Sequence, residues 1–391
     1  LVINTSEGQT ADQIGIWIDH LPYGAGVDMV MKGDNLYCAV QQGMFILNTK
    51  DRDIQRLSKL NGLSDVNVTA LALSPATGEI IIGYENANID LLLGGEIVNI
   101  PDISLSANYP GLKTINHLFP FENLVYISTD FGIVVLDLDR RIIRQTYIIG
   151  ENGENLKVNQ VVVNPNTDRI YAATDQGLFS ALRSSALQFY ANWKKDPVMN
   201  TPIKQATFFD NTVYINKAGP PTNDSLFYLA SGVWNHVAEI SPSAYDFMKG
   251  GNGYLSICNN FSAQGFRKNG TNLALAFNVN FAFVKYDQYN PVASLAGEGE
   301  SGVFWSLDEK RGLYLNFGTY HENIFPNSPA SKKVYQIHHN GNRVFVAPGE
   351  INGTWLRQFN SSGFYTLNVE DFIWTNYLKE DIGDLVDILA V

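Results

Sequence analysis

Short apolar segments separated by polar turns recur along the whole chain. Each unit has an apolar strand, a polar turn, a second apolar strand with Tyr or an equivalent residue, a turn with Asp or Gly, and a third strand. One residue marks each second strand, in the order Tyr37, Ile81, Tyr126, Tyr171, Tyr214, Tyr254, Phe304 and Phe345. These markers lie roughly 40 to 50 residues apart, which is the period of a four-stranded propeller blade.

The kind of periodicity separates strands from helices. Helical solenoids share this repeat length, but their segments show apolar positions every three or four residues. The segments here are short apolar runs or alternate between apolar and polar positions, and Gly, Asn, Asp and Pro occupy the turns between them. We therefore predict an all-β protein built as a propeller.

A tryptophan marks the outermost strand of several units. Trp193, Trp234 and Trp374 close the fourth, fifth and eighth units, and Trp17 lies in a related N-terminal segment. The seventh unit ends at 312–317 without such a strand, and an open sheet edge invites aggregation. We expect residues 14–21 to supply the missing fourth strand, so that the N-terminal strand closes a seven-bladed β-propeller.

The eighth unit needs no such help, because it has a Trp-bearing strand of its own within 364–374. We predict a leader at 1–13, the seven-bladed propeller at 14–326, and a linker with the first blade of a second propeller at 327–391. Residues 385–391 would open the next blade, so the chain would continue beyond Val391. A single ring of eight blades is the alternative.

Charge and composition narrow the partners. The formal net charge is −12 and the sequence pI is about 4.9, so the surface repels phosphate backbones and nucleic acid is excluded as a partner. The basic pairs Arg140-Arg141 and Lys194-Lys195 do not alter this. No apolar run reaches the ~18 residues of a membrane span. The chain begins at Leu1 without Met, as expected after removal of a signal peptide.

Motifs for catalysis or metal binding are missing from the sequence. There is no Gly-x-Ser-x-Gly elbow and no His-Glu-x-x-His or His-x-His pattern. His338 and His339 are adjacent, and neighbours on a strand point to opposite faces. We expect no enzyme activity, no catalytic, cofactor or metal residues and no cofactor; the binding residues stay unknown. The six histidines are His20, His117, His236, His321, His338 and His339, of which His20 and His236 each follow a strand Trp and suggest a structural role.

Several smaller features have structural interpretations. Asp130, Asp175 and Asp308 recur beside the turn into the third strand, where an Asp caps turn amides; a ring of carboxylates on one face is the alternative. Gly43, Gly132, Gly177 and Gly312 fit turns that need positive φ. Cys38 and Cys258 are expected as buried free thiols. The acidic run at 297–302 is interpreted as a linker, and 217–225 as an inserted loop of the kind that carries binding function.

The segment from 57 to about 179 resembles the regulator-type propeller repeats of exported Bacteroidetes proteins. The matching strings are Leu57-Ser-Lys-Leu-Asn-Gly-Leu-Ser-Asp-Val-Asn-Val-Thr-Ala-Leu, Ile82-Gly-Tyr-Glu-Asn-Ala-Asn-Ile-Asp-Leu-Leu, Phe131-Gly-Ile-Val-Val-Leu-Asp-Leu and Tyr171-Ala-Ala-Thr-Asp-Gln-Gly-Leu-Phe. Within these, Asn-Ile-Asp-Leu-Leu and Phe-Gly-Ile-Val-Val-Leu-Asp-Leu are more similar to the N-terminal propeller of the PorZ family of type IX secretion components. The passage from Pro326-Asn-Ser-Pro-Ala to Arg343-Val-Phe-Val-Ala-Pro-Gly resembles that family's entry into a second propeller.

This resemblance implies a non-catalytic binding or scaffold protein, exported to the periplasm, outer membrane or cell surface. PorZ-like proteins act beside a PorU-like sortase and help to attach secreted cargo to anionic lipopolysaccharide. The implied partners are that sortase, an acidic glycan, or both. Because the Gly-Leu-Ser-Asp element also occurs in periplasmic sensors of hybrid two-component systems, an oligosaccharide-binding sensor propeller is the alternative function. A propeller lyase or glycosidase is a third.

Overall fold

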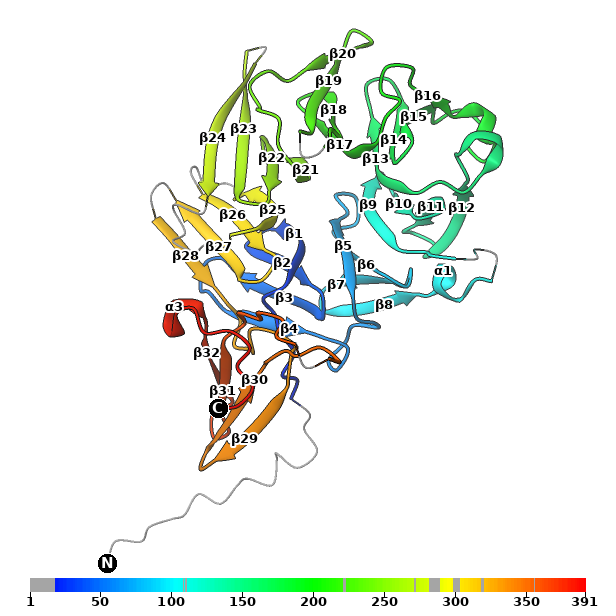
Figure 1. Cartoon of the computed structure of the whole chain (residues 1–391). Helices are drawn as coiled ribbons and strands as arrows, with labels where there is room; N and C mark the ends of the chain where they lie inside the picture. The colour runs from blue at the N-terminus through cyan, green and yellow to red at the C-terminus, as the bar shows by residue number, and fades with distance from the viewer. Residues whose placement is uncertain are drawn as a thin grey trace, which may run out of the picture.

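The structure is a computed structural model that describes residues 18–107, 109, 111–220, 223–270, 272–280, 289–297, 303–317, 320–354 and 356–391. This part of the chain is all-β apart from four short helical turns, and its strands form four-stranded antiparallel sheets (Figure 1). In every sheet the four strands follow each other in sequence order. The predicted all-β class and blade-like unit are therefore correct.

The first seven sheets occupy the chain up to residue 324. They consist of the strands β1 (Gly26–Lys32), β2 (Asn35–Val40), β3 (Gly43–Asn48) and β4 (Ile54–Leu57); β5 (Val68–Leu73), β6 (Ile80–Tyr84), β7 (Ile89–Leu93) and β8 (Glu96–Ile100); β9 (Ile115–Phe121), β10 (Leu124–Thr129), β11 (Gly132–Asp137) and β12 (Ile142–Tyr147); β13 (Val158–Asn164), β14 (Arg169–Thr174), β15 (Gly177–Leu182) and β16 (Lys194–Lys195); β17 (Ile203–Phe209), β18 (Thr212–Lys217), β19 (Ser225–Ala230) and β20 (Val233–His236); β21 (Tyr245–Gly251), β22 (Tyr254–Asn259), β23 (Ser262–Asn269) and β24 (Asn272–Asn280); and β25 (Pro291–Ala296), β26 (Val303–Asp308), β27 (Gly312–Phe317) and β28 (Tyr320–Ile324).

The eighth sheet contains β29 (Gln336–Asn340), β30 (Arg343–Ala347), β31 (Phe364–Asn368) and β32 (Ile373–Tyr377). The helical turns are α1 (Asp102–Leu105), α3 (Lys379–Ile382) and the 3-10 turns η2 (Glu151–Gly153) and η3 (Tyr190–Asn192). In Figure 1 the eighth sheet lies outside the arrangement of the other seven, beyond β3, β4 and β28. The expected strand at 385–391 is absent: this segment is irregular and lies against the eighth sheet's loops, where the Gly349 N–H donates to the Ile388 carbonyl.

The first strand of each of the first seven sheets begins with a β-bulge. The extra residue lies at the same place each time and is Val27, Thr69, Asn116, Asn159, Lys204, Asp246 or Val292. A bulge bends its strand and re-aims side chains. No such shift interrupts the pairing of β29 with β30, so the eighth sheet differs from the others at this point.

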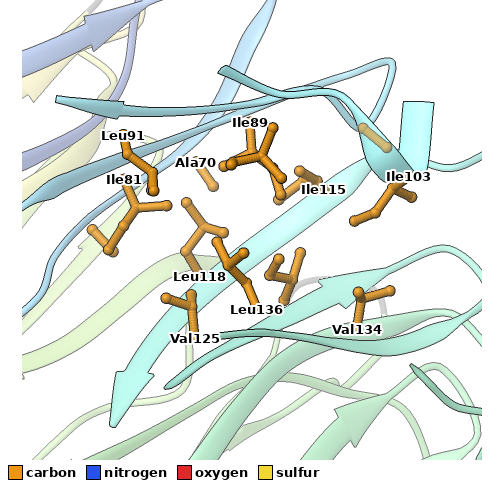
Figure 2. Packing of buried hydrophobic residues seen from close by; sticks show 14 of the residues in the cluster. Ala70, Ile81, Ile89, Leu91, Ile103, Ile115, Leu118, Val125, Val134 and Leu136 are labelled. Atoms are coloured by element: carbon orange, nitrogen blue, oxygen red, sulfur yellow. The ribbon is translucent and has the colours of Figure 1, made fainter. Parts of the chain in front are cut away.

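Separate hydrophobic cores fill the seams between neighbouring sheets. The core between β5–β8 and β9–β12 contains Ile81, Ile89, Leu118 and Leu136, whose side chains face one another in Figure 2. Equivalent cores lie between the first and second sheets and at each seam from the third sheet to the seventh. A further core joins the first and seventh sheets, where β1 packs against β25 and β26. Burial of apolar surface at these seams holds successive sheets face to face.

The expectation that residues 14–21 form the fourth strand of the seventh sheet is wrong. Residues 14–17 lie outside the described part, and 18–25 contain no strand. The seventh sheet has its own fourth strand, β28, which pairs with β27 from Phe317–Tyr320 to Leu313–Ile324. No Trp marks this strand, whose sequence is Tyr-His-Glu-Asn-Ile; an outer edge strand accepts such polar residues. Among the strands that the structure describes, the first and seventh sheets share none: they meet by packing of β1 against β25 and β26, and the Gly312 N–H donates to the Gly24 carbonyl at 2.9 Å.

Candidate functional site

A cavity lies among the first strands of the first seven sheets. Its volume is about 350 Å³. Every one of the strands β1, β5, β9, β13, β17, β21 and β25 contributes to the wall. Small-molecule sites in proteins are typically concave, mostly apolar and of roughly 300–1,000 Å³, so this cavity has the size and character of a binding site.

One cation enters this cavity from β21. The Lys249 ammonium donates to the carbonyl oxygen of Met29 at 3.3 Å and lies 3.6 Å from the Asp28 carboxylate. That carboxylate also accepts hydrogen bonds from the backbone N–H groups of Met29, at 2.8 Å, and Leu71, at 3.1 Å. Asp28 therefore links β1 to β5 through a hydrogen bond and partly balances the charge of Lys249.

His117 on β9 lines the same cavity as a neutral imidazole. Its Nδ1 is enclosed and has no hydrogen-bond partner among the described residues. Burial, with a smaller effect from the positive charge of Lys249, lowers the pKa of His117 to about 3. At neutral pH the cavity therefore holds a single positive charge.

Other polar side chains of the wall fix neighbouring strands to one another. Gln160 accepts a hydrogen bond through Oε1 from the Ala206 N–H at 3.0 Å, and Thr207 accepts one through Oγ1 from the Gly250 N–H at 2.9 Å. Both bonds join the first strands of successive sheets. These contacts pre-form the cavity, which reduces the entropy lost on binding.

A shallower hollow of about 340 Å³ lies beside the cavity, between the ends of β17 and β23. The Arg267 guanidinium lies over the Tyr254 ring at 5.5 Å, and the Lys268 ammonium lies 3.6 Å from Asp210. These cations already have aromatic or carboxylate partners.

Two of the recurring aspartates belong to a hydrogen-bonded clip, in which one asparagine side chain bonds to an aspartate of its own sheet and to a backbone carbonyl of the next sheet. Asn116 Nδ2 donates to Asp130 Oδ1 at 3.2 Å and to the Val158 carbonyl of the next sheet at 3.0 Å. One sheet further on, Asn159 Nδ2 donates to Asp175 Oδ1 and to the Ile203 carbonyl, both at 2.9 Å. These aspartates accept from a bulge asparagine instead of from turn amides, and their role is structural.

Lysine takes the asparagine's place in the fifth sheet. The Lys204 ammonium lies 2.8 Å from Asp224 and 3.4 Å from Asp246 of the next sheet. Burial opposes its charge, but the bond to Asp224 and the negative charge of both aspartates raise the pKa of Lys204 overall. Asp224 belongs to the predicted inserted loop, of which residues 221–222 are not described; it is buried and accepts from the Gly219 and Tyr245 N–H groups. This part of the loop therefore anchors the fold.

Asp308 matches the turn-capping prediction. Its Oδ1 accepts from the N–H groups of Lys310 and Arg311 at 2.8 and 2.9 Å, and its Oδ2 accepts from the Asn290 N–H at 2.7 Å. Burial raises the pKa of this carboxyl even though these bonds oppose the change. The acidic run's residues 298–302 lie outside the described part.

The predicted positive φ is confirmed at Gly132, Gly177 and Gly312 but not at Gly43. All four glycines also allow close approach of the chain that follows the third strand: an added Cβ at Gly43 would lie 2.4 Å from the Leu57 carbonyl oxygen. Equivalent carbonyls meet the other three at 2.4, 2.7 and 3.1 Å.

The remaining candidate residues are dispersed. His338 and His339 are exposed on β29, and within the described ranges no group of three or more His, Cys, Asp or Glu side chains could hold a metal ion. Cys38 and Cys258 are buried free thiols, as predicted. The His236 ring contacts Phe227 edge-on at 5.4 Å, and His321 Nδ1 lies 2.7 Å from Asn316 Oδ1.

The motifs behind the family resemblance meet inside the second sheet. Asp90, fully buried, accepts hydrogen bonds from the Tyr84 hydroxyl at 2.6 Å, the Ser64 N–H at 2.8 Å and Asn99 Nδ2 at 2.9 Å. Burial first, and then the charge of Asp90, raises the pKa of Tyr84. The Gly-Leu-Ser-Asp and Asn-Ile-Asp-Leu-Leu elements are thus two halves of one internal network.

The sequence analysis did not single out Asp28 or Lys249, and it assigned no role to His117. A signal was available, because Asp28 and His117 each directly follow the bulge residue of a first strand. That alignment becomes visible only when the bulges place the strands in register.

A known protein-family model matches part of the chain. Residues 36–194 match the model of the N-terminal β-propeller domain of PorZ, a type IX secretion protein. None of the curated proteins compared with the chain matches it. None of the helices in the described part reaches the length and apolarity that a membrane-crossing helix needs.

Solved structures show the same fold at low sequence identity. PorZ of Porphyromonas gingivalis, described as an essential bacterial surface component of the type-IX secretion system, is 19% identical with a TM-score of 0.74. The match covers 94% of this chain and 46% of that protein, so this chain spans about half its length. An ancestral GH74 enzyme is 14% identical, with a TM-score of 0.60 over 92% of this chain and 55% of its own.

A more distant likeness extends to the β-propeller domain of Cps50 (Swd1) from Myceliophteria thermophila. It is 10% identical, with a TM-score of 0.55 over 75% of this chain and 95% of that domain. At these identities each likeness is one of fold. Together with the family match over 36–194, they show that the chain carries a PorZ-like β-propeller.

Proposed function

We propose that this chain is a non-catalytic binding propeller of a type IX secretion system, exported and acting at the periplasmic or outer surface of the outer membrane. The observation that carries this proposal is the match of residues 36–194 to the PorZ N-terminal propeller, reinforced by the fold likeness to PorZ over 94% of the chain. The first seven sheets would be the blades of one propeller whose ring closes where β1 packs against β25.

Two features favour binding over hydrolysis. Glycoside hydrolysis generally needs two carboxylates that flank the scissile bond. Among the described residues that line the cavity there is no Asp or Glu, and Asp28 beside it is already engaged by two backbone N–H groups and Lys249. The carboxylates Asp130, Asp175 and Asp90 are held in structural bonds.

Net charge bears on the choice of partner. A formal charge of −12 repels a polyanion such as anionic lipopolysaccharide at long range. We therefore favour a direct contact with a sortase-like protein, through which the chain would take part in attaching cargo to lipopolysaccharide.

Direct binding tests this proposal. The chain is immobilised, and a purified PorU-like sortase and purified anionic lipopolysaccharide are passed over it separately by biolayer interferometry. We expect saturable binding of the sortase, with a weaker lipopolysaccharide signal that grows as salt screens the repulsion. Absence of sortase binding would overturn the preferred partner, and tight binding of a neutral oligosaccharide instead would support a sensor propeller.

A further inference from the structure

The wall of the central cavity divides unequally between apolar and polar groups. The lining contributed by β1, β5 and β9 is mainly apolar: Leu73 and Phe119 are partly exposed, and Met29, Leu71 and Leu118 lie behind the wall as members of the buried cores. The strands β13, β17, β21 and β25 bring Gln160, Thr207, Lys249 and Ser294, beside Phe208 and Met248, and Asn252 in the turn after β21 and Ser256 on β22 add two more polar groups. A molecule with an apolar body and one polar end matches this arrangement better than a uniformly polar one.

The polar end is selected by charge. Lys249 is the charged residue among the described lining residues, and 36% of its side-chain surface is exposed. Its contacts to the Met29 carbonyl and Asp28 are long, at 3.3 and 3.6 Å. Because an ammonium has three N–H donors, at least one remains for an anionic group in the cavity.

The number of charges on the ligand is limited by His117. This imidazole is neutral because burial and the nearby Lys249 disfavour its protonation. Asp28 beside the cavity already accepts from the backbone N–H groups of Met29 and Leu71, which offset part of its charge. The cavity then offers one cation, so a phosphate dianion or an acidic polysaccharide would keep at least one unpaired negative charge, and burial without full pairing is costly. A ligand with a single negative charge therefore fits the cavity best.

We infer that the central cavity is a binding site for a small organic monoanion, such as an aliphatic carboxylate, whose charged group lies at Lys249 and whose apolar body lies against β1, β5 and β9. This inference concerns the cavity alone and stands whether or not the chain takes part in secretion.

Hexanoate, with hexanamide and acetate as matched probes, tests the inference by isothermal titration calorimetry on the full chain. Hexanamide keeps the apolar body without the charge, and acetate keeps the charge without the body. We expect hexanoate to bind at one site with a Kd roughly tenfold or more below those of both other probes, which corresponds to about 1.4 kcal/mol. Lys249→Met should remove the preference for hexanoate over hexanamide, whereas Lys249→Arg should keep it.

A substitution that fills the cavity tests whether the ligand binds there. Gly251 lines the cavity, and an added Cβ there meets no atom within 4 Å. Gly251→Leu should therefore abolish binding of both hexanoate and hexanamide while circular dichroism and Tm stay unchanged. Gly353→Leu, at an equally open glycine outside the cavity lining, and Lys50→Met, at an exposed lysine, are the matched controls and should bind as the parent does.

Three results would overturn the inference: no saturable binding of hexanoate to the folded parent chain, equal binding of hexanoate and hexanamide, or undiminished binding by folded Gly251→Leu. If Lys249→Met does not fold, the comparison between hexanoate and hexanamide on the parent still decides. Sortase binding by Gly251→Leu should persist, so failure of this inference and failure of the proposed function are separate outcomes.

Discussion

The Trp374 indole donates a hydrogen bond through Nε1 to Nδ1 of His20 at 3.2 Å, joining residues 354 positions apart. The two rings also contact edge-on, with centroids 5.6 Å apart. Through this contact the segment before β1 holds the outer strand of the eighth sheet. The segment that sequence analysis assigned to the seventh sheet thus connects the first seven sheets to the eighth.

Removing the indole donor should loosen this connection. Trp374→Phe keeps an aromatic ring but loses the N–H, so we expect a loss of about 1 kcal/mol in the local stability of the eighth sheet. Hydrogen exchange of β32 measures it. Trp193→Phe is the control, because its Nε1 bonds to the Leu187 carbonyl inside the fourth sheet's own loop and should leave β32 unchanged.

The same contact should depend on pH. Burial, together with the charge of Arg56 and against that of Asp19, lowers the pKa of His20, so the folded chain favours the neutral ring that can accept at Nδ1. The stabilisation is present above the unfolded value of about 6.5 and is lost as pH falls through the lowered folded pKa. In Trp374→Phe, exchange of β32 should vary less with pH over this range; an identical pH dependence would contradict the assignment.

His117 should contribute an acid-sensitive part of the stability of the whole domain. Its pKa is about 3 when folded and about 6.5 when unfolded, so the unfolded chain binds the proton more strongly. The contribution is present above about pH 6.5 and decreases as pH falls towards 3. His117→Gln should flatten the urea-unfolding free energy across this window relative to the parent, and an unchanged slope would show that His117 is accessible to protons in the fold.

The clip between the fourth and fifth sheets can be tested at Asn159. Asn159→Ala removes the bonds to Asp175 and to the Ile203 carbonyl, and we expect a loss of about 1–3 kcal/mol in the free energy of unfolding. Gln176→Ala changes an exposed neighbour of Asp175 and should cost less than about 0.5 kcal/mol. Chemical denaturation measures the stability of both variants. Equal stabilities would show that the Asn159 hydrogen bonds do not stabilise the contact between the two sheets.

The internal network of the second sheet predicts a graded response. Tyr84→Phe leaves Asp90 with two other donors and should cost about 1 kcal/mol. Asp90→Ala removes the acceptor of the Ser64 N–H and of the buried Tyr84 hydroxyl, whereas Asn99 Nδ2 keeps Asn88 Oδ1 and the Ile89 carbonyl; the change should cost about 3 kcal/mol or more. Thermal unfolding measures both, and retained partner binding by Tyr84→Phe is expected because this network is internal.

The sequence by itself determined most of the strand-forming segments and the buried thiols. These follow from local alternation, turn residues and apolar burial, each of which acts over a few positions. The blade-like period and the PorZ-like motifs at 62–65 and 84–90 could be read in the same way, since Asp90 and its partners lie close together in sequence.

The tertiary structure decided which distant segments meet. The strand β28 looked unlike a fourth strand because it lacks the Trp marker, yet its pairing with β27 left residues 18–25 to contact Trp374 instead. The cavity with Asp28, His117 and Lys249 arises because seven bulged strands from separate sheets converge, and convergence depends on the packing of whole sheets. Contacts across hundreds of residues leave no periodic trace in sequence, so only the folded chain shows them.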